Sequence, residues 1–274
     1  MAKEIKTIGV LTSGGDAPGM NPAIRAVVRT AINKGLKVKG IQKGYNGLIN
    51  DEIIDMDKKS VSDIIQRGGT VLYTARCLEF MTEEGQKKAA EVCKKHGIDG
   101  MVVIGGDGSF RGAQKLADAG VNTIGLPGTI DLDIACTDYT IGFDTAVNTA
   151  MQAIDKIRDT STSHERCSII EVMGRNAGWL TGATALAKSE DCDGPDLIYL
   201  PEVPFDVEKF LAKVKDLLNK KASIVIAVSE GIKLADGRYV CELGSVGDYV
   251  DAFGHKQLQG TATYLANFLA AECG

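Results

Sequence analysis

The residues with the clearest chemical potential lie in the stretch Met101–Arg111, which reads MVVIGGDGSFR. Its four leading apolar residues predict a buried strand, its glycines predict a tight turn, and Phe110–Ala119 can form a helix with Ser109 as the N-cap. A strand that turns directly into a helix presents free backbone N–H groups at the positive end of the helix dipole, where phosphate binds well. Asp107 lies inside this turn, and its carboxylate would repel a phosphate unless a divalent cation lay between them. The stretch therefore predicts a turn that binds a metal ion and a phosphate together.

Two further glycine-rich turns follow predicted strands, Ser13–Gly19 (SGGDAPG) and Pro127–Asp133 (PGTIDLD). In an open parallel sheet such turns gather at the carboxyl edge, where ligands bind at the switch in strand order. A single one is often only a tight turn that needs glycine, but three with embedded aspartate or threonine favour phosphate binding. The sequence contains neither a GxxxxGK[ST] loop nor a GxGxxG fingerprint, which disfavours P-loop proteins and dinucleotide-binding dehydrogenases.

Two carboxylates in the third turn, Asp131 and Asp133, flank Leu132. If this stretch is extended, both carboxylates share one face, and the alternative is a solvated turn. A carboxylate beside Thr129 at the end of a strand can take a proton from an attacking hydroxyl group. Phosphoryl transfer needs little else from a protein beyond positioning, a metal on the phosphates and cationic groups.

Several arginines are candidates for those cationic groups. Arg76, Arg166 and Arg175 are bordered by turn residues or strands, so each is either an anion ligand or a surface charge. Arg25 and Arg29 lie four residues apart on a predicted helix, and this pair is either a solvated face or an anion site.

The elements that must position these residues alternate between strands and helices, which predicts parallel sheets covered on both faces. The predicted strands are 5–11, 38–41, 101–104, 121–126, 168–172, 197–200 and 223–228. The predicted helices are one capped by Asn21 and ended by Gly35, and those near 60–66, 82–96, 110–119, 144–158, 179–187, 207–218 and 261–273. GYNG is predicted to be a turn, and Asp236-Gly237 predicts a hairpin. The pattern restarts after about Gly142, so we expect two α/β domains, 1–141 and 142–274.

The composition fits a globular protein of two domains, because the chain has 274 residues. No apolar run approaches the length needed to span a membrane, and we expect no signal peptide. The seven cysteines are scattered, which predicts free thiols and a cytoplasmic location. A net charge of −5 disfavours nucleic acid as the main partner.

Eight short motifs occur in a specific order: LTSGGDAPGMN, RGGT, TAR, VVIGGDGS, LPGTID, DYTIGFDTA, DTSTSHER and EVMGR. With these motifs the chain resembles the ATP-dependent 6-phosphofructokinases of the phosphofructokinase A family, from about Ile8 to Glu230. The resemblance implies two doubly wound α/β domains with largely parallel sheets and an active site in the cleft between them. The first domain (1–141) would bind the nucleotide, and the second (142–274) would bind the sugar phosphate.

The activity that the resemblance implies is transfer of the γ-phosphoryl group of ATP to the 1-hydroxyl of fructose 6-phosphate, with Mg²⁺, in glycolysis. The product would be fructose 1,6-bisphosphate. The resemblance also implies a homotetramer or homodimer, with neither nucleic acid nor a membrane as a partner.

By motif position, the resemblance assigns roles to individual residues. The residues that would line the nucleotide are Gly15, Arg76, Cys77, Gly106, Asp107, Gly108 and Ser109, with Asp107 on the Mg²⁺. The residues that would bind the sugar phosphate are Thr129, Ile130, Asp131, Met173, Gly174, Arg175 and Glu230, together with Arg166 from a neighbouring subunit. Asp131 would be the catalytic base, assisted by Thr129 and Arg175. The residues at effector-site positions are Arg25, Arg29 and Arg158.

The phosphoryl donor is the first open point. Gly108 and Gly128 occupy positions where pyrophosphate-using relatives tend to carry Asp and Lys, which favours ATP. The segment GPDLIYLPE, in contrast, is more like the pyrophosphate-using branch. A pyrophosphate-dependent phosphofructokinase is therefore an alternative.

The chain also departs from the family pattern in two places. Leu132 replaces the asparagine of the usual TIDND motif, which we expect to slow turnover or to mark a branch. The sequence ends at Gly274, before the family's distal Arg and His ligands of the sugar 6-phosphate, so we expect a truncated chain. Two other functions are alternatives. One is a lipid or NAD kinase, which shares the GGDG[ST] turn, and the other is an inactive or regulatory nucleotide-binding fragment.

Overall fold

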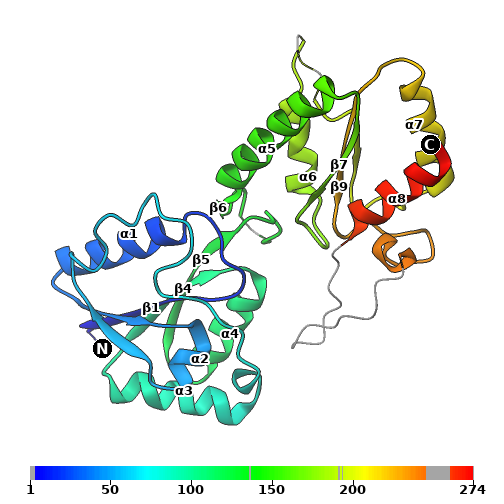
Figure 1. Ribbon diagram of the computed structural model, residues 1–274. Helices are drawn as coiled ribbons and strands as arrows, with labels where there is room; N and C mark the ends of the chain where they lie inside the picture. The colour runs from blue at the N-terminus through cyan, green and yellow to red at the C-terminus, as the bar shows by residue number, and fades with distance from the viewer. Residues whose placement is uncertain (1–3, 136, 191, 193, 245–259, 274) are drawn as a thin grey trace. The chain divides into compact units, whose positions relative to one another are not determined.

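The computed structural model describes residues 4–135, 137–190, 192, 194–244 and 260–273. The chain divides into two compact units, Met1–Thr145 and Ala146–Gly274, which we call unit 1 and unit 2. Each unit is a mainly parallel sheet flanked by helices (Figure 1). The predicted α/β class with two largely parallel sheets is therefore confirmed.

Unit 1 is built on a six-stranded sheet with the order β3-β2-β1-β4-β5-β6, in which only β3 runs antiparallel to its neighbour. Its strands are β1 (Thr7–Thr12), β2 (Lys37–Ile41), β3 (Ile53–Met56), β4 (Gly100–Gly105), β5 (Asn122–Thr129) and β6 (Ile141–Gly142). Its helices are α1 (Met20–Asn33), α2 (Gly44–Ile49), α3 (Glu83–Lys95) and α4 (Asp107–Asp118), with a 3₁₀ turn at Glu79–Met81. Helix α5 (Phe143–Ser163) begins in unit 1 and continues into unit 2.

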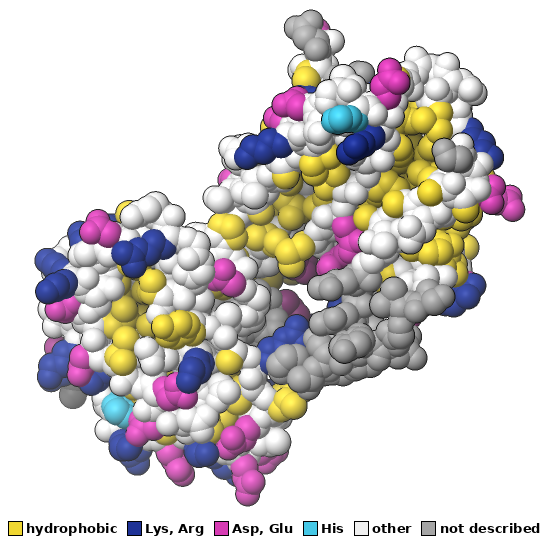
Figure 2. Space-filling model, in the orientation of Figure 1, with side chains coloured by type: hydrophobic (Ala, Val, Ile, Leu, Met, Phe, Trp, Pro, Cys, Tyr) yellow, Lys and Arg dark blue, Asp and Glu magenta, His cyan; other side chains and the backbone are white. Residues whose placement is uncertain are grey.

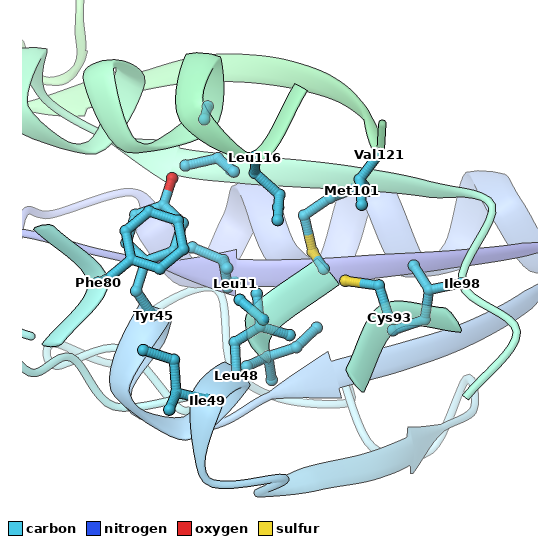
Figure 3. Close-up of a cluster of buried hydrophobic side chains, with 14 residues drawn as sticks. Leu11, Tyr45, Leu48, Ile49, Phe80, Cys93, Ile98, Met101, Leu116 and Val121 are labelled. Carbon is cyan, nitrogen blue, oxygen red and sulfur yellow. The ribbon is translucent and has the colours of Figure 1, made fainter. Parts of the chain in front are cut away.

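Helices cover both faces of the unit 1 sheet because its central strands are apolar on both sides. On β1, Val10 faces the cluster that contains the apolar side of α1, and Leu11 faces the cluster formed with α2, α3 and α4. Figure 3 shows this second cluster, in which the ring of Tyr45 stacks on Phe80 with a centroid distance of 4.2 Å. The hydroxyl group of Tyr45 donates a hydrogen bond to the carbonyl oxygen of Ser109, 2.7 Å away. The core thus holds the first turn of α4 in place.

Unit 2 contains a three-stranded parallel sheet with the order β7-β9-β8. Its elements are β7 (Cys167–Val172), α6 (Trp179–Ala183), a 3₁₀ turn at Thr184–Ala187, β8 (Leu197–Tyr199), α7 (Val207–Leu218), β9 (Ile224–Ser229), a 3₁₀ turn at Val240–Leu243 and α8 (Thr261–Cys273). Every residue of the central strand β9 is buried. Its residues alternate between a cluster with α7 and α8 on one face and a cluster with α5 on the other.

The strand order of unit 1 reverses between β1 and β4. The chain runs outward from β1 to β2 and β3, then returns to place β4 on the other side of β1. Since β1, β4 and β5 are parallel neighbours, the turns that follow them lie at one edge of the sheet. This edge is the switch point at which open α/β sheets bind ligands.

Several local predictions are confirmed. The helices predicted near 82–96 and at 207–218 are present as α3 and α7. Their N-caps are Thr82 and Asp206, whose side chains accept hydrogen bonds from the backbone N–H groups of Gly85 and Lys209. Asp236-Gly237 forms the predicted turn, in which Leu234 and Arg238 are joined by a backbone hydrogen bond of 2.9 Å. The six described cysteines are free thiols, and Cys136 lies outside the described residues.

Four local predictions are wrong. GYNG is not a turn but the start of the short helix α2, which the core stabilises by burying Tyr45 and Leu48. Residues 60–66 form turns instead of a helix. The strand expected at 121–126 runs on to Thr129, because it continues to pair with β4 and then β6. Asn21 does not cap α1, since the N-cap position is held by Gly19 and the Asn21 amide is used elsewhere.

Among the described residues, no helix combines the length and apolar character needed to cross a membrane. Large hydrophobic side chains are nevertheless exposed on both units, and Figure 2 shows hydrophobic surface between charged side chains. The most exposed of them include Met81, Ile124, Tyr139, Met173, Trp179 and Leu186.

Tyr45→Phe tests the anchor of α4. The substitution keeps the stacked ring and removes only the hydrogen bond to the Ser109 carbonyl, so we expect the free energy of unfolding to fall by about 1 kcal/mol. Urea denaturation measures this change. Tyr139→Phe is the control, because Tyr139 is 65% exposed, and a fall of equal size in both variants would contradict the anchor.

Candidate active site

The turn after β4 leads directly into α4, whose N-cap is Gly106 and whose first residue is Asp107. Ser109, predicted as the cap, lies one turn further on, is 3% exposed and has no hydrogen-bond partner for its Oγ among the described residues. Ser109 fails to cap because its side chain packs against Gly14 and Gly105 instead. A Cβ atom at Gly105 would lie 2.5 Å from the carbonyl oxygen of Ser13, so only glycine fits there. The turns after β1 and β4 are therefore in direct contact.

Asp107 carries the carboxylate at the N-terminus of α4. Its Oδ2 lies 2.9 Å from the Nη2 of Arg111, one turn along the helix, and both side chains are more than half exposed. No cluster of three or more His, Cys, Asp or Glu side chains suited to a metal occurs among the described residues. A single carboxylate nevertheless fits Mg²⁺, which is commonly held by one or two carboxylates together with substrate phosphates and water.

The turn after β1 contacts the loop 67–76, which ends at Arg76 and is followed by Cys77. Thr12 Oγ1 donates to the carbonyl oxygen of Tyr73 at 2.8 Å, and Thr74 Oγ1 donates to the carbonyl oxygen of Gly14 at 2.6 Å. Arg76 is exposed, and Cys77 is half-buried against the core cluster of Figure 3. Gly15 is exposed, with open space where a side chain would lie.

The turn after β5 adds the second carboxylate. The backbone N–H of Asp131 donates to Thr129 Oγ1 at 3.2 Å, and Ile130 is half-buried beside them. A Cβ atom at Gly106 would lie 3.8 Å from Thr129 Cβ, so the turns after β4 and β5 are also neighbours. Burial raises the pKa of the Asp131 carboxyl, the Asp133 carboxylate raises it further, and the Thr129 hydroxyl offsets part of the rise.

The two carboxylates do not lie along an extended strand. β5 ends at Thr129, and Leu132 adopts a left-handed backbone conformation with φ of 55°. Asparagine and glycine tolerate this conformation far better than leucine. The expectation that Asp131 and Asp133 share a face of an extended segment is therefore wrong, although Asp133 still acts electrostatically on Asp131.

The two glycines that bear on the phosphoryl donor differ in their surroundings. Gly108 has nothing within 4 Å of the position that a Cβ atom would take, so the space beside it is open. At Gly128 the same atom would lie 3.0 Å from Ile104 Cγ2, in a buried position. Packing alone therefore explains why residue 128 is a glycine, whereas packing does not require a glycine at position 108.

Unit 2 brings together a second group of predicted residues at the carboxyl ends of β7 and β9. Met173, Gly174 and Arg175 follow β7, and Glu230 follows β9, which pairs with β7 up to Val172 and Ser229. Glu230 Oε1 accepts a hydrogen bond from the Gly174 N–H at 3.4 Å. Ser229 Oγ donates to the Gly174 carbonyl oxygen, which holds the loop after β7 against the end of β9.

Arg166 does not join this group. It precedes β7, whereas Met173 follows it, and the strand between them spans about 20 Å. Arg166 is exposed at the amino end of the sheet of unit 2.

The three predicted effector-site arginines lie on two helices. Arg25 and Arg29 are half-buried on α1 in unit 1, and the Nε of Arg29 is buried with no hydrogen-bond partner among the described residues. Arg158 lies on α5 in unit 2, where its Nη2 is 3.0 Å from the Oδ1 of Asp155.

Comparison with known proteins adds an independent result. The profile of the family described as phosphofructokinase matches residues 7–274. An ATP-dependent 6-phosphofructokinase of Clostridium botulinum is 54% identical over 270 residues, which cover 97% of this chain and 83% of the relative. The same description applies to a Thermoanaerobacter protein that is 54% identical over 275 residues, covering 98% of this chain and 84% of the relative.

Two solved structures share the fold. A phosphofructokinase from Saccharomyces cerevisiae superposes with a TM-score of 0.78 at 32% identity, over 96% of this chain and 36% of that one. A pyrophosphate-dependent phosphofructokinase from Marinobacter aquaeolei gives a TM-score of 0.80 at 25% identity, over 97% of this chain and 65% of that one.

Leu132→Asn tests the strain at the turn after β5. Because asparagine tolerates the left-handed conformation, we expect the free energy of unfolding to rise by about 0.5–1 kcal/mol. Urea denaturation of the variant beside the wild type measures the change. Leu132→Ala is the control that keeps a Cβ atom and hence the strain, and an equal gain in both variants would show that the backbone conformation is not the cause.

Proposed function

The chain belongs to the phosphofructokinase family, and from that premise we infer that it is an ATP-dependent 6-phosphofructokinase of glycolysis. It transfers the γ-phosphoryl group of ATP to the 1-hydroxyl of fructose 6-phosphate. The observation that carries this inference is the contact between the turns after β1, β4 and β5, which bear Asp107 and Asp131 at one sheet edge.

The nucleotide is proposed to bind at the turns after β1 and β4. The N-terminus of α4 offers backbone N–H groups and the positive end of its dipole to the phosphates. No atom lies within 4 Å of the position that a Cβ atom would take at Gly15 or at Gly108, so phosphate groups can approach the backbone closely at both glycines. Arg76, the last residue of the loop 67–76, supplies positive charge next to this edge.

Mg²⁺ is proposed to bind through Asp107. A bound ion would supply positive charge there, which would offset the repulsion between the Asp107 carboxylate and the phosphates. In the structure Arg111 pairs with Oδ2 of the same carboxylate, 2.9 Å away.

Asp131 is proposed to act as the general base. Its carboxylate takes the proton of the 1-hydroxyl as the oxygen attacks the γ-phosphorus, and the bond from that phosphorus to the leaving oxygen of ADP breaks. Its raised pKa makes it a better proton acceptor than an ordinary aspartate. Thr129 orients the turn through its hydrogen bond with the Asp131 N–H.

The sugar phosphate is proposed to bind to Met173, Gly174, Arg175 and Glu230, which the sheet of unit 2 gathers at one edge. The separate place of Arg166 at the opposite end of β7 supports the idea that it serves a neighbouring subunit. Exposed hydrophobic residues such as Trp179 support self-association into a dimer or tetramer. Arg25, Arg29 and Arg158 remain proposed ligands of an anionic effector.

A coupled assay tests the function directly. We expect ADP formation that depends on both ATP and fructose 6-phosphate, with much slower turnover when pyrophosphate replaces ATP. Gly108 supports ATP because a side chain there would fill the open space beside the helix N-terminus. ATP binding without ADP formation would instead indicate a regulatory nucleotide-binding chain.

Asp131→Ala tests the base. We expect kcat to fall by about 10²–10⁴-fold, the contribution typical of a general base, while the affinity for MgATP measured by equilibrium titration stays within about twofold. Asp138→Ala is the control, since Asp138 is an exposed carboxylate further along the same segment. An equal loss of MgATP affinity in Asp131→Ala would refute the assignment.

Asp133→Asn tests the electrostatics of the base. The Asp133 carboxylate is the second cause of the raised Asp131 pKa, after burial. Its removal lowers that pKa, so the deprotonated base persists to lower pH and the acidic limb of the kcat/KM profile moves to lower pH. Part of the elevation remains because burial is unchanged, and Asp138→Asn should leave the limb in place. A limb that does not move, or moves upward, would contradict the coupling.

A further inference from the structure

The carboxamide of Asn21 is buried and makes three long-range hydrogen bonds. Its Nδ2 donates to the carbonyl oxygens of Arg67 at 3.0 Å and Gly69 at 2.8 Å. Its Oδ1 accepts from the backbone N–H of Val71 at 2.8 Å. Asn21 is 2% exposed, so each of these bonds replaces contact with water that the group has lost.

The loop 67–76 has turns and bends but no helix or strand of its own. Gly69 and Tyr73 adopt left-handed backbone conformations, with φ of 78° and 59°. For tyrosine this conformation costs free energy, and such strain persists only where surrounding contacts impose it. The loop therefore depends on outside contacts for its shape.

Those contacts come from the end of β1, the turn after it, the start of α1 and Lys43, whose backbone N–H donates to the Leu72 carbonyl oxygen at 2.8 Å. Besides Asn21, Asp16 Oδ1 accepts from the Thr70 N–H at 2.9 Å, and Thr12 Oγ1 lies 2.9 Å from Thr70 Oγ1. Thr74 adds the bond to the Gly14 carbonyl. Among these contacts of the described residues, Asn21 alone bonds to three separate residues of the loop, which places it at the centre of the contacts that hold the loop.

We propose that Asn21 is a positioning residue that fixes the loop 67–76 and so carries Arg76 to the nucleotide end of the site. The inference rests on the proposed function, since it assigns Arg76 to the nucleotide. Asn21 is buried, so we assign it no direct contact with a substrate. It acts because its amide has two donors and one acceptor that match two carbonyl oxygens and one N–H group of the loop.

Asn21→Asp and Asn21→Ala test the proposal. Asn21→Asp is isosteric and keeps the acceptor for Val71, but it faces the Arg67 and Gly69 carbonyl oxygens with a carboxylate and loses both donors. We expect roughly tenfold weaker MgATP binding in equilibrium titration for either variant, the scale of one or two buried hydrogen bonds. We also expect faster amide hydrogen exchange at Thr70 and Val71, with KM for fructose 6-phosphate changed by less than about twofold.

A double-mutant cycle separates positioning from general loss of stability. If Asn21 acts through Arg76, Asn21→Ala should weaken MgATP binding by less than about twofold in an Arg76→Ala background. Asn122→Asp is the matched control, because its Nδ2 also donates to a backbone carbonyl, that of Asp99, at the amino end of β5. It adds the same charge to unit 1 and should leave MgATP affinity unchanged.

Three results would overturn the proposal: unchanged MgATP affinity in both Asn21 variants, equal weakening with and without Arg76, or unchanged affinity in Arg76→Ala alone. Should the Asn21 variants fail to fold, Thr74→Val removes the bond between the loop and the Gly14 carbonyl oxygen and should weaken MgATP binding. Thr74→Ser keeps the hydroxyl group, so it should retain MgATP affinity and slow amide hydrogen exchange in the loop. If the wild-type chain binds MgATP but forms no ADP with fructose 6-phosphate, the proposed function fails while the cycle still decides the role of Asn21.

Discussion

The candidate site depends on the close approach of two backbone turns at the carboxyl ends of β1 and β4. The Ser13 N–H donates to the carbonyl oxygen of Ile104 at 3.0 Å, which extends the pairing of these strands into the turns. Gly105 has no side chain that would separate the turns, and Ser109 fills the space left beside it. Because the apolar core fixes both strands, the start of α4 is held in one place with its N–H groups exposed. The proposed nucleotide site depends on this contact.

The carboxyl edge of the unit 1 sheet carries two carboxylates, Asp107 and Asp131, although the proposed nucleotide is itself an anion. Asp107 is offset by Arg111 in the free chain, and a divalent ion can take over that role. Asp131 differs, because burial and the neighbouring Asp133 raise its pKa, which supports its proposed role as the base. Two aspartates of the same sheet edge thus acquire different chemistry from their surroundings.

In unit 2, as in unit 1, parallel strands place the residues that follow them at one edge of the sheet. The parallel pairing of β7 and β9 brings the MGR loop and Glu230 together, and the buried hydroxyl of Ser229 ties them. Strand direction also explains why Arg166 stands apart, since a residue before a strand and a residue after it lie at opposite edges. Residues that belong to the same set of sequence motifs therefore need not lie in the same spatial cluster.

The sequence by itself determined the α/β class, most strands and helices, and the three glycine turns, because apolar runs and turn residues are local signals. It also located the two helices that Thr82 and Asp206 cap, where the capping bond is made within the same turn. It failed at Ser109 and Asn21, which are residue types that often cap helices: Ser109 is buried between two turns, and Asn21 bonds to a loop far along the chain. It could not foresee the left-handed backbone at Leu132, since leucine gives no signal for it. Tertiary structure decided these positions, because the packing of turns that are distant in the chain, and not the neighbouring residues, determines the surroundings of each residue.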